Sequence, residues 1–280
     1  MVAEAVDALL VNRLPDGTIP LHPYAKWRGA HWVLVMLAEL GHPGGDESLV
    51  PLREQVLGWL LSDTYAKRWL PRRHGLCRMH ASQDANAVWS LLTLRLDDDR
   101  VDALAQRLVD AQWPDGGWNC DPRPEATVSS VEETLIPMRA LTLHGRVRGN
   151  DASRSAAARA AELFLERRLY RRLRDGRPMA DRFLRLAFPA YWHYDILFGL
   201  KVMAEAEQIG DARCADALDL LEGKKLPDGG FPAEACHYRG STARSNASDV
   251  DWGGTSTRRS NPWVTRDAVS VLAAAGRLPR

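Results

Sequence analysis

Apolar residues recur every three or four positions through most of the chain, the spacing of helices with a buried face. This pattern predicts helices over 2–12, 25–40, 46–62, 82–97, 99–113, 129–145, 152–169, 192–208, 211–224 and 262–277. Sustained alternation of apolar and polar residues, which would indicate strands, is not convincing in any segment. The sequence therefore predicts an all-α protein.

A short turn sequence recurs between these stretches. Its clearest copies are RLPDGT at 13–18, QWPDGGW at 112–118 and KLPDGGF at 225–231, with weaker copies at 70–76 and 173–177. Proline presets one backbone angle and the glycine two residues later accepts positive φ, so each copy should end a helix and reverse the chain. Turns spaced roughly 40 to 60 residues apart are typical of repeated two-helix units.

The helices fall into two kinds. Those before a turn have one apolar and one charged face, whereas those after a turn are apolar nearly all round. The first kind suits an outer ring and the second an inner ring. We therefore expect one domain, residues 1–280, folded as an α/α toroid (barrel) of about five helical hairpins with inner and outer helix rings. Alternation of the two kinds would start every inner helix at the same rim.

Charge and composition limit the classes of partner that the chain is expected to bind. The chain has 37 basic and 36 acidic side chains, so it has no electrostatic footprint for nucleic acid. The first residues lack the pattern of a secretory signal, and no apolar run approaches the length of a transmembrane segment. Four scattered cysteines fit reduced thiols better than a disulfide framework. We expect a cytoplasmic protein.

Residues 112–118 resemble the Gln-x-x-x-Gly-x-Trp repeat of squalene and oxidosqualene cyclases, whose barrels share a fold with protein prenyltransferase β subunits, and 225–231 resemble a degenerate copy. Further stretches, such as FPAYWHYDIL, look like those of bacterial squalene-cyclase-like proteins. The resemblance implies that Gln112 and Trp118 bridge neighbouring outer helices. It also implies a terpenoid cyclase-like or prenyltransferase-like protein that holds a hydrophobic or prenyl-type small molecule in a central aromatic cavity. Those barrels have about six hairpins, so a smaller or open ring is one alternative here.

The acidic motifs of terpene chemistry are absent or misplaced. Class II cyclases protonate their substrate with an Asp-x-Asp-Asp motif, and the nearest string here, Asp249-Val250-Asp251-Trp252, lacks the final aspartate. Asp98-Asp99-Arg100-Val101-Asp102 spells the magnesium-binding Asp-Asp-x-x-Asp motif, but it lies where an inner helix ends and an outer helix begins. Acidic residues are common in the first turn of a helix, so we expect these aspartates to cap it at the opposite rim.

The resemblance also makes zinc a candidate cofactor. Protein prenyltransferases bind a catalytic zinc ion through an Asp, a Cys two residues later and a distant His. Cys120-Asp121 and His193 offer the same ligand types in a different order, and Cys77 and His80 add two more. We expect Cys120 and His193 as metal ligands. The alternative is that the cysteines fill apolar space and the histidines cap helices or form hydrogen bonds.

The same rim supplies candidates for acid–base catalysis, namely Asp121, Glu133, His193 and Asp195. The inner helices near 129 and 192 should be neighbours, so we expect Asp121, His193 and Asp195 to meet, with Cys120 close by. Facing carboxylates also leave open a carbohydrate-active enzyme, and a non-catalytic binding module is a third alternative.

Substrate contacts are expected from aromatic and polar side chains on or just before inner helices. Packing explains the aromatic residues equally well, and helix capping explains Asp84 and Glu133. The expected contacts are Trp27, His31, Asp84, Trp118, Trp192, Tyr194 and Trp263.

Overall fold

The computed structural model describes residues 1–69, 72–73 and 75–278. It is 50% helical with almost no strand, so the prediction of an all-α protein is confirmed. The α-helices are α1 (Val2–Leu10), α2 (Ala30–Glu39), α3 (Val50–Leu60), α4 (Asp63–Trp69), α5 (Ala81–Thr93), α6 (Asp99–Ala111), α7 (Val131–Arg148), α8 (Asp151–Glu166), α9 (Ile196–Glu205), α10 (Ala215–Glu222) and α11 (Pro262–Ala274).

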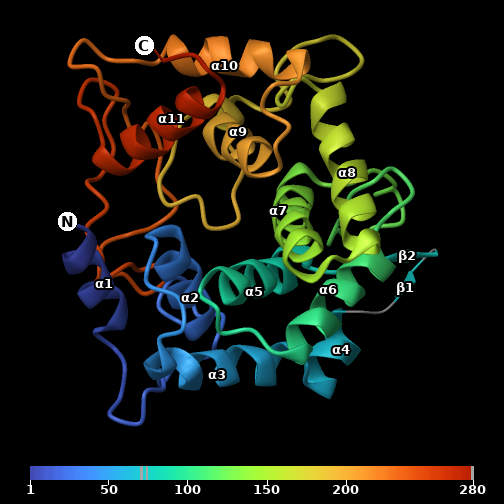
Figure 1. Cartoon of the computed structure of the whole chain (residues 1–280), viewed down its shortest axis with the longest axis vertical. Helices are drawn as coiled ribbons and strands as arrows, with labels where there is room; N and C mark the ends of the chain where they lie inside the picture. Colours follow the sequence, from blue (N-terminus) through green and yellow to red (C-terminus); the bar gives the residue numbers. More distant parts are fainter. Residues whose placement is uncertain (70–71, 74, 279–280) are drawn as a thin grey trace. The chain divides into compact units, whose positions relative to one another are not determined.

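Every stretch predicted as helical overlaps one of these helices (Figure 1). The sequence pattern missed the short α4 and a two-stranded antiparallel pair, β1 (Arg72–Arg73) and β2 (Leu76–Cys77). Three 3₁₀ turns, η1 (Glu47–Leu49), η2 (Asp181–Leu184) and η3 (Ala212–Cys214), complete the regular elements of the described residues. Within this described part, no helix has both the length and the apolar character needed to cross a bilayer.

The chain divides into two compact units. Unit 1 comprises Met1–Ala157 and Tyr238–Asp251, and unit 2 comprises Ala158–His237 and Trp252–Arg280. The boundary falls within α8. The toroid and the single domain remain predictions.

Three helices of unit 1 that the sequence predicts to be inner are neighbours, because α5 packs against both α2 and α7. At the N-terminal ends of α5 and α7, the Ser82 N–H donates to Glu133 Oε2 at 2.9 Å. At their C-terminal ends, Arg148 pairs with Asp97 at 2.5 Å. The residues that follow α2 reach the C-terminal end of α5, where the Gly45 N–H donates to the Leu94 carbonyl at 2.8 Å. The N-terminal ends of α5 and α7 therefore lie together, and so do the C-terminal ends of α2 and α5.

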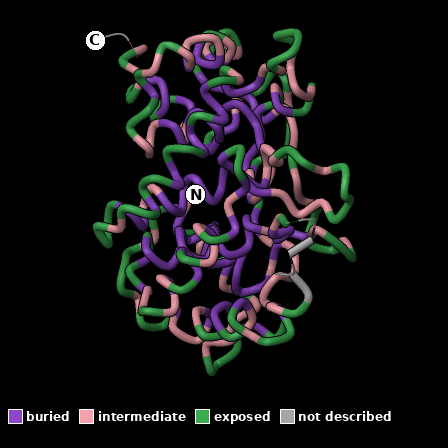
Figure 2. Tube along the Cα trace, turned by 90° about the vertical axis from the view of Figure 1, so that its right-hand side faces the viewer, coloured by how far each residue is buried: buried purple, intermediate pink, exposed green. Residues whose placement is uncertain are grey.

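Burial separates the two kinds of helix in unit 1. Every residue of α5 from Ala81 to Leu92 is buried, whereas α6 buries only positions on one face, namely Val101, Leu104, Ala105, Leu108 and Ala111. Figure 2 shows buried segments in the interior of the trace and exposed segments mostly at its periphery. Inner helices need apolar residues all round, which is the pattern that the sequence shows.

The three clearest turn copies share one backbone conformation. The residue before the proline donates its N–H to the carbonyl four residues later, at 2.8 Å from Leu14, 2.8 Å from Trp113 and 2.9 Å from Leu226. The glycine after the aspartate has positive φ in all three, 82°, 94° and 85°. The weaker copy at 173–177 has Gly176 at φ 68°. The copy predicted at 70–76 lies partly outside the described residues.

Two of these turns dock in the same way on the helix that follows, one in each unit. The Trp118 N–H donates to Thr134 Oγ1 at 3.2 Å, in the first turn of α7. The Phe231 N–H donates to Thr265 Oγ1 at 2.8 Å, in the first turn of α11. The sequence repeat is thus also a repeat of tertiary contacts, in which a turn is fixed to the start of an inner helix.

The acidic string at 98–102 lies near the C-terminal end of α7, away from the contact between Ser82 and Glu133. Asp98 is the N-cap of α6, and its Oδ1 accepts the Arg100 N–H at 3.0 Å, so the capping prediction is confirmed. Asp102 accepts from His144 at 3.1 Å and from Arg148 at 3.0 Å. At 1.5 Å of rise per residue, His144 lies about 17 Å along α7 from Glu133. The string is therefore remote from the rim where α5 and α7 begin.

Candidate metal centre

Three segments of unit 1 bring an imidazole, a thiol and a carboxylate together. His80 is the N-cap residue of α5, Cys120 lies in the loop 119–130 that follows the second turn copy, and Glu133 is in the first turn of α7. Their ligand atoms all lie within 4.8 Å of one another. Among the described residues, this is the group of His, Cys, Asp and Glu side chains with the geometry to hold a metal ion.

Glu133 is fixed at the centre of this cluster. Its Oε2 accepts the backbone N–H of Ser82 at 2.9 Å, and its Oε1 lies 3.3 Å from His80 Nδ1. The carboxylate is nearly buried, with 9% of the side chain exposed, whereas 32% of the His80 side chain is exposed. Glu133 therefore satisfies a backbone donor at the start of α5 with one oxygen and presents the other to His80.

The Cys120 thiol is held in its neutral form. Burial raises its pKa to about 12, and the negative charge of Glu133 and a hydrogen bond to that carboxylate add to the shift. Nucleophilic cysteines have a lowered pKa instead, so this environment opposes direct thiolate catalysis. A divalent cation would replace the thiol proton and remove the repulsion between thiolate and carboxylate.

The donor set matches zinc. Imidazole nitrogen, thiolate sulfur and carboxylate oxygen are all zinc ligands, and three protein ligands with one open position are typical of catalytic zinc sites. A tetrahedral ion with the usual bond lengths holds its ligand atoms about 3.3–3.8 Å apart. The 3.3 Å between His80 and Glu133 already fits this separation, and the limit of 4.8 Å requires shifts on the scale of side-chain rotamer adjustments.

Tyr24 and His31 lie beside the cluster. Burial raises the pKa of Tyr24, and the charges of Glu133 and Cys120 raise it further, against a hydrogen bond from Gln83 that lowers it. The Tyr24 ring packs 5.6 Å from the ring of His31, which is 1% exposed. Burial lowers the pKa of His31 to about 3, so its imidazole is neutral, and neither ring nitrogen has a hydrogen-bond partner in the residues that the structure describes.

The other predicted site carboxylates of unit 1 are engaged. Asp84 is fully buried and accepts from Tyr65 Oη at 3.1 Å and from Arg107 Nε at 2.7 Å. Asp121 pairs with Arg123 at 2.5 Å, and hydrogen bonds from Arg123 lower the pKa of Asp121 to about 2. Both carboxylates are therefore occupied by hydrogen bonds and ion pairs with neighbouring residues.

Trp27 and Trp118 are buried in unit 1. The Trp27 ring meets Trp32 edge to face at 4.7 Å, and Trp118 Nε1 donates to the Leu108 carbonyl at 2.9 Å. Trp27 is 3% exposed and Trp118 is 0% exposed, so packing accounts for both positions.

His193 belongs to unit 2, where it forms a stack of rings. Its imidazole lies 3.9 Å from the Trp192 ring and 3.6 Å from the His237 ring, nearly parallel to both. Asp195 is the N-cap of α9, with its carboxylate accepting the N–H groups of Phe198 at 2.9 Å and Ala187 at 3.0 Å. Cys120 and Asp121 are in unit 1, so their predicted meeting with His193 and Asp195 stays a prediction.

The remaining predicted contact residues are also buried in unit 2. Tyr194 Oη donates to the Leu169 carbonyl at 2.5 Å, and its ring stacks 5.7 Å from Phe164. Trp263, in the first turn of α11, stacks 5.5 Å from Phe188.

The sequence offered His80 and Cys120 as possible ligands of one metal ion but placed Glu133 only among the acid–base candidates, so the three were not grouped. Cys120 was paired with His193 because the prenyltransferase pattern places the His far along the chain. The overlooked signal is positional: His80 immediately precedes one inner helix, and Glu133 is in the first turn of the next. Parallel inner helices bring these two positions to one rim.

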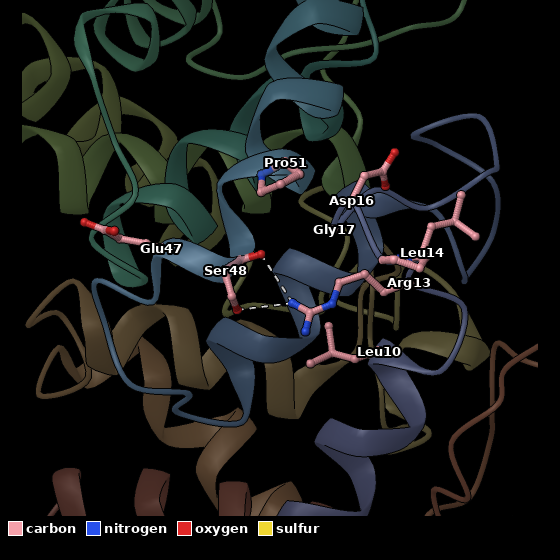
Figure 3. Close-up of a pocket in the computed structure, with 9 residues that line it drawn as sticks. Leu10, Arg13, Leu14, Asp16, Gly17, Glu47, Ser48 and Pro51 are labelled. Carbon is pink, nitrogen blue, oxygen red and sulfur yellow. Dashed lines mark hydrogen bonds between the residues drawn. The ribbon is translucent and has the colours of Figure 1, made fainter.

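A surface depression of about 590 Å³ lies elsewhere in unit 1, beside the first turn copy (Figure 3). Arg13 reaches across it and donates to Ser48 Oγ at 3.1 Å, while Asp16 accepts from the Thr18 N–H at 2.9 Å. Its lining does not combine ligating or nucleophilic groups as the metal centre does. The cluster of His80, Cys120 and Glu133 is therefore the stronger candidate site.

Comparison with protein-family models and with curated proteins finds no match to this chain, so its family is a matter of proposal.

Proposed function

We propose that this chain is a zinc-dependent enzyme with the α/α-toroid architecture of squalene cyclases and protein prenyltransferases, acting on a hydrophobic or prenyl-type small molecule. The observation that carries the proposal is the convergence of His80, Cys120 and Glu133 within 4.8 Å. These residues come from three separate segments, and each offers a ligand type that zinc prefers.

The three residues have distinct roles in this proposal. His80 supplies a neutral nitrogen through the side that faces Glu133, and Cys120 supplies a thiolate once its proton is lost. Glu133 supplies Oε1 while its Oε2 stays on the Ser82 N–H. A zinc ion bound there would supply Lewis acidity and would lower the pKa of a bound water or thiol.

Two features support the toroid and the apolar substrate. The Gln112 side chain donates to the Gly116 carbonyl at 2.7 Å and to the Ala156 carbonyl of α8 at 2.8 Å, so it joins the end of one outer helix to the next. The resemblance to cyclases implies this bridging role. Aromatic rings of Tyr24, Trp32 and Trp59 gather around His31 beside the metal ligands, and such surfaces favour apolar ligands.

Metal content is the first test. Protein purified without chelator should carry about one zinc per chain by elemental analysis, because three ligands and an open position suffice for a catalytic site. Cys120→Ala and His80→Ala should each lose the metal. Cys236→Ala, which changes an exposed cysteine of unit 2, is the matched control and should keep it. If the wild-type protein is purified without metal and also fails to bind added zinc, the proposal is wrong.

Ligand class is the second test. Tryptophan fluorescence should report saturable binding of farnesol or farnesyl diphosphate by the zinc-loaded protein. Binding of oligosaccharides in place of prenyl compounds would favour the carbohydrate alternative. The engaged state of Asp84 and Asp121 argues against that outcome within unit 1, because neither carboxylate is placed to act as a general acid or base.

A further inference from the structure

A buried arginine, Arg78, joins the segment that carries His80 to the loop that carries Cys120. It follows β2 directly and is 5% exposed. Its Nη1 donates to the Asp121 carbonyl at 2.6 Å and to the Ala126 carbonyl at 3.0 Å. Both carbonyls belong to the loop 119–130, and one belongs to the residue next to Cys120. The guanidinium therefore fixes the backbone that positions the thiol.

The loop has internal bonds of a different kind. Asn119 Nδ2 donates to the Val128 carbonyl at 2.9 Å, and the Ser129 N–H donates to Asp115 Oδ2 at 2.8 Å. These bonds close the loop onto itself and onto its own turn. Arg78 is different because it connects the loop to the segment of a second metal ligand, so its loss should change the separation of Cys120 and His80.

The charge of Arg78 is not matched by an ion pair. Its guanidinium lies over the Trp113 ring at 5.2 Å, and Nε and Nη2 have no hydrogen-bond partner within the described part of the chain. Among the described residues no carboxylate forms an ion pair with it, although it adds to the lowering of the Asp121 pKa after the larger effect of Arg123. Two hydrogen bonds to carbonyls leave the charge itself without a balancing carboxylate, and burying such a charge is costly, which a purely mechanical strap would not require.

The charge balance of the proposed zinc site indicates a role for the Arg78 cation. A thiolate and a carboxylate cancel the two positive charges of a zinc ion, and a neutral imidazole adds none. Asp121 and Arg123 cancel each other in the loop. Arg78 then leaves one uncancelled positive charge on the segment next to His80, which favours an anion at the open coordination position.

We propose that Arg78 is a positioning residue that holds Cys120 in place for metal binding and makes an anion the preferred fourth ligand. The inference rests on the proposed zinc site. It adds a residue that is not a ligand, and it gives the chemical class of the group that completes the metal's coordination.

The test compares two substitutions that separate charge from geometry. Arg78→Lys keeps the charge but loses the planar fork, whereas Arg78→Gln loses the charge. Arg123→Gln is the matched control, because it removes an arginine of the same loop whose side chain is 76% exposed. Zinc affinity is measured by competition with a chromophoric chelator. Anion affinity is measured by titrating azide into the cobalt-loaded protein and following its absorption.

Arg78→Gln should weaken azide binding about tenfold, whereas Arg78→Lys should stay within about twofold of wild type. Both variants should weaken zinc binding by about 10-fold or more, as loss of an outer-shell partner does. Arg123→Gln should change neither quantity by more than about twofold. Equal azide affinity in wild type and Arg78→Gln would overturn the charge role, and an equal loss in Arg123→Gln would overturn its assignment to Arg78.

A metal-free measurement separates this inference from the proposed function. Hydrogen exchange should be faster for amides in the loop 119–130 of Arg78→Gln, while amides in the buried part of α5 keep their protection. Unchanged exchange in the loop overturns the positioning role even if zinc binds. Failure of the wild-type protein to bind zinc overturns the proposed function and, with it, the anionic fourth ligand. The exchange result still tests whether Arg78 holds the loop 119–130 in place.

Discussion

Glu133 Oε2 accepts the backbone N–H of Ser82 at 2.9 Å, which links the first turn of α7 to the first turn of α5. The first N–H groups of a helix have no partner within the helix, and a carboxylate there is favoured by the helix dipole. The same side chain turns Oε1 towards His80. One residue therefore aligns two inner helices and supplies a candidate metal ligand.

Substitutions of Glu133 should distinguish its role in helix alignment from its role as a metal ligand. Glu133→Ala should lower the free energy of unfolding by about 1–3 kcal/mol, because the buried Ser82 N–H loses its acceptor. Glu133→Gln keeps an oxygen for that N–H and should cost about 1 kcal/mol or less, while zinc binding is lost. Urea unfolding and elemental analysis measure the two effects. Glu125→Gln, on an exposed residue of the loop, is the control and should alter neither.

The titration of Cys120 gives a second prediction, made for metal-free protein. Glu133 raises the pKa of the thiol through its charge and through the hydrogen bond that it accepts. Glu133→Gln removes that charge, so the pKa should fall and alkylation by iodoacetamide at pH 8 should become faster. Mass spectrometry of the labelled peptides measures this, with the exposed Cys236 as the internal reference. Slower alkylation of Cys120 in the variant would contradict the assigned contact.

The sequence predicted local structure well where local chemistry determines it. Proline and glycine at fixed spacing define the turns at 13–18, 112–118 and 225–231, and the structure confirms their shared conformation. The apolar period located the helices, but α4 is too short for a periodic pattern to detect. The strands β1 and β2 are two residues each, so alternation could not be recognised there.

The candidate site was predicted only in part, for a physical reason. Sequence reasoning expected Cys120 and Glu133 close together because one precedes and the other begins the same predicted inner helix. The sequence did not reveal that the loop 119–130 folds back towards the start of α5. Arg78 joins the two segments through hydrogen bonds from its side chain to carbonyls that are distant in the sequence. Such contacts have no local sequence pattern. Asp121 illustrates the converse, since its local partner Arg123 is two residues away.

The acidic string provides a third prediction. Asp98→Ala should lower the free energy of unfolding by about 1 kcal/mol through loss of the α6 cap, without changing zinc content. The combined change of Asp98, Asp99 and Asp102 to Asn should leave ligand binding intact, because Asp98 caps α6 and Asp102 contacts the far end of α7. Calorimetric titration with magnesium provides the check. Magnesium binding that disappears in the triple variant would show that the string is a metal site.

The turn glycines allow a matched pair of substitutions. Gly116 and Gly229 have positive φ, so alanine at either should cost about 1 kcal/mol or more. Gly58 lies in the last turn of α3, and an added Cβ meets no atom within 4 Å. Gly58→Ala should therefore stabilise the protein by up to about 1 kcal/mol. Thermal unfolding of the three variants tests the sign, and a stabilising Gly116→Ala would contradict the turn conformation.

The buried carboxyl of Asp195 should make stability depend on pH. Burial raises its pKa to about 7, although backbone N–H groups of Phe198, Ala187 and Leu197 lower it and Asp267 raises it. The unfolded carboxyl has a pKa near 3.8, so the folded protein binds the extra proton between these values. Stability from this group is complete below pH 3.8 and is lost as the pH rises through about 7.

The expected result is a fall in the free energy of unfolding of about 1 kcal/mol per pH unit between pH 5 and 7 from this group. Asp195→Asn should remove that slope, because asparagine is neutral at every pH and still caps α9. Urea unfolding at pH 5, 6, 7 and 8 measures the difference between the two proteins. Asp211→Asn is the control: Asp211 also caps a helical turn, but Arg213 lowers its pKa to about 2, so it stays ionised across this range. A wild-type protein that gains stability relative to Asp195→Asn as the pH rises from 5 to 8 would show that the backbone donors outweigh burial at Asp195.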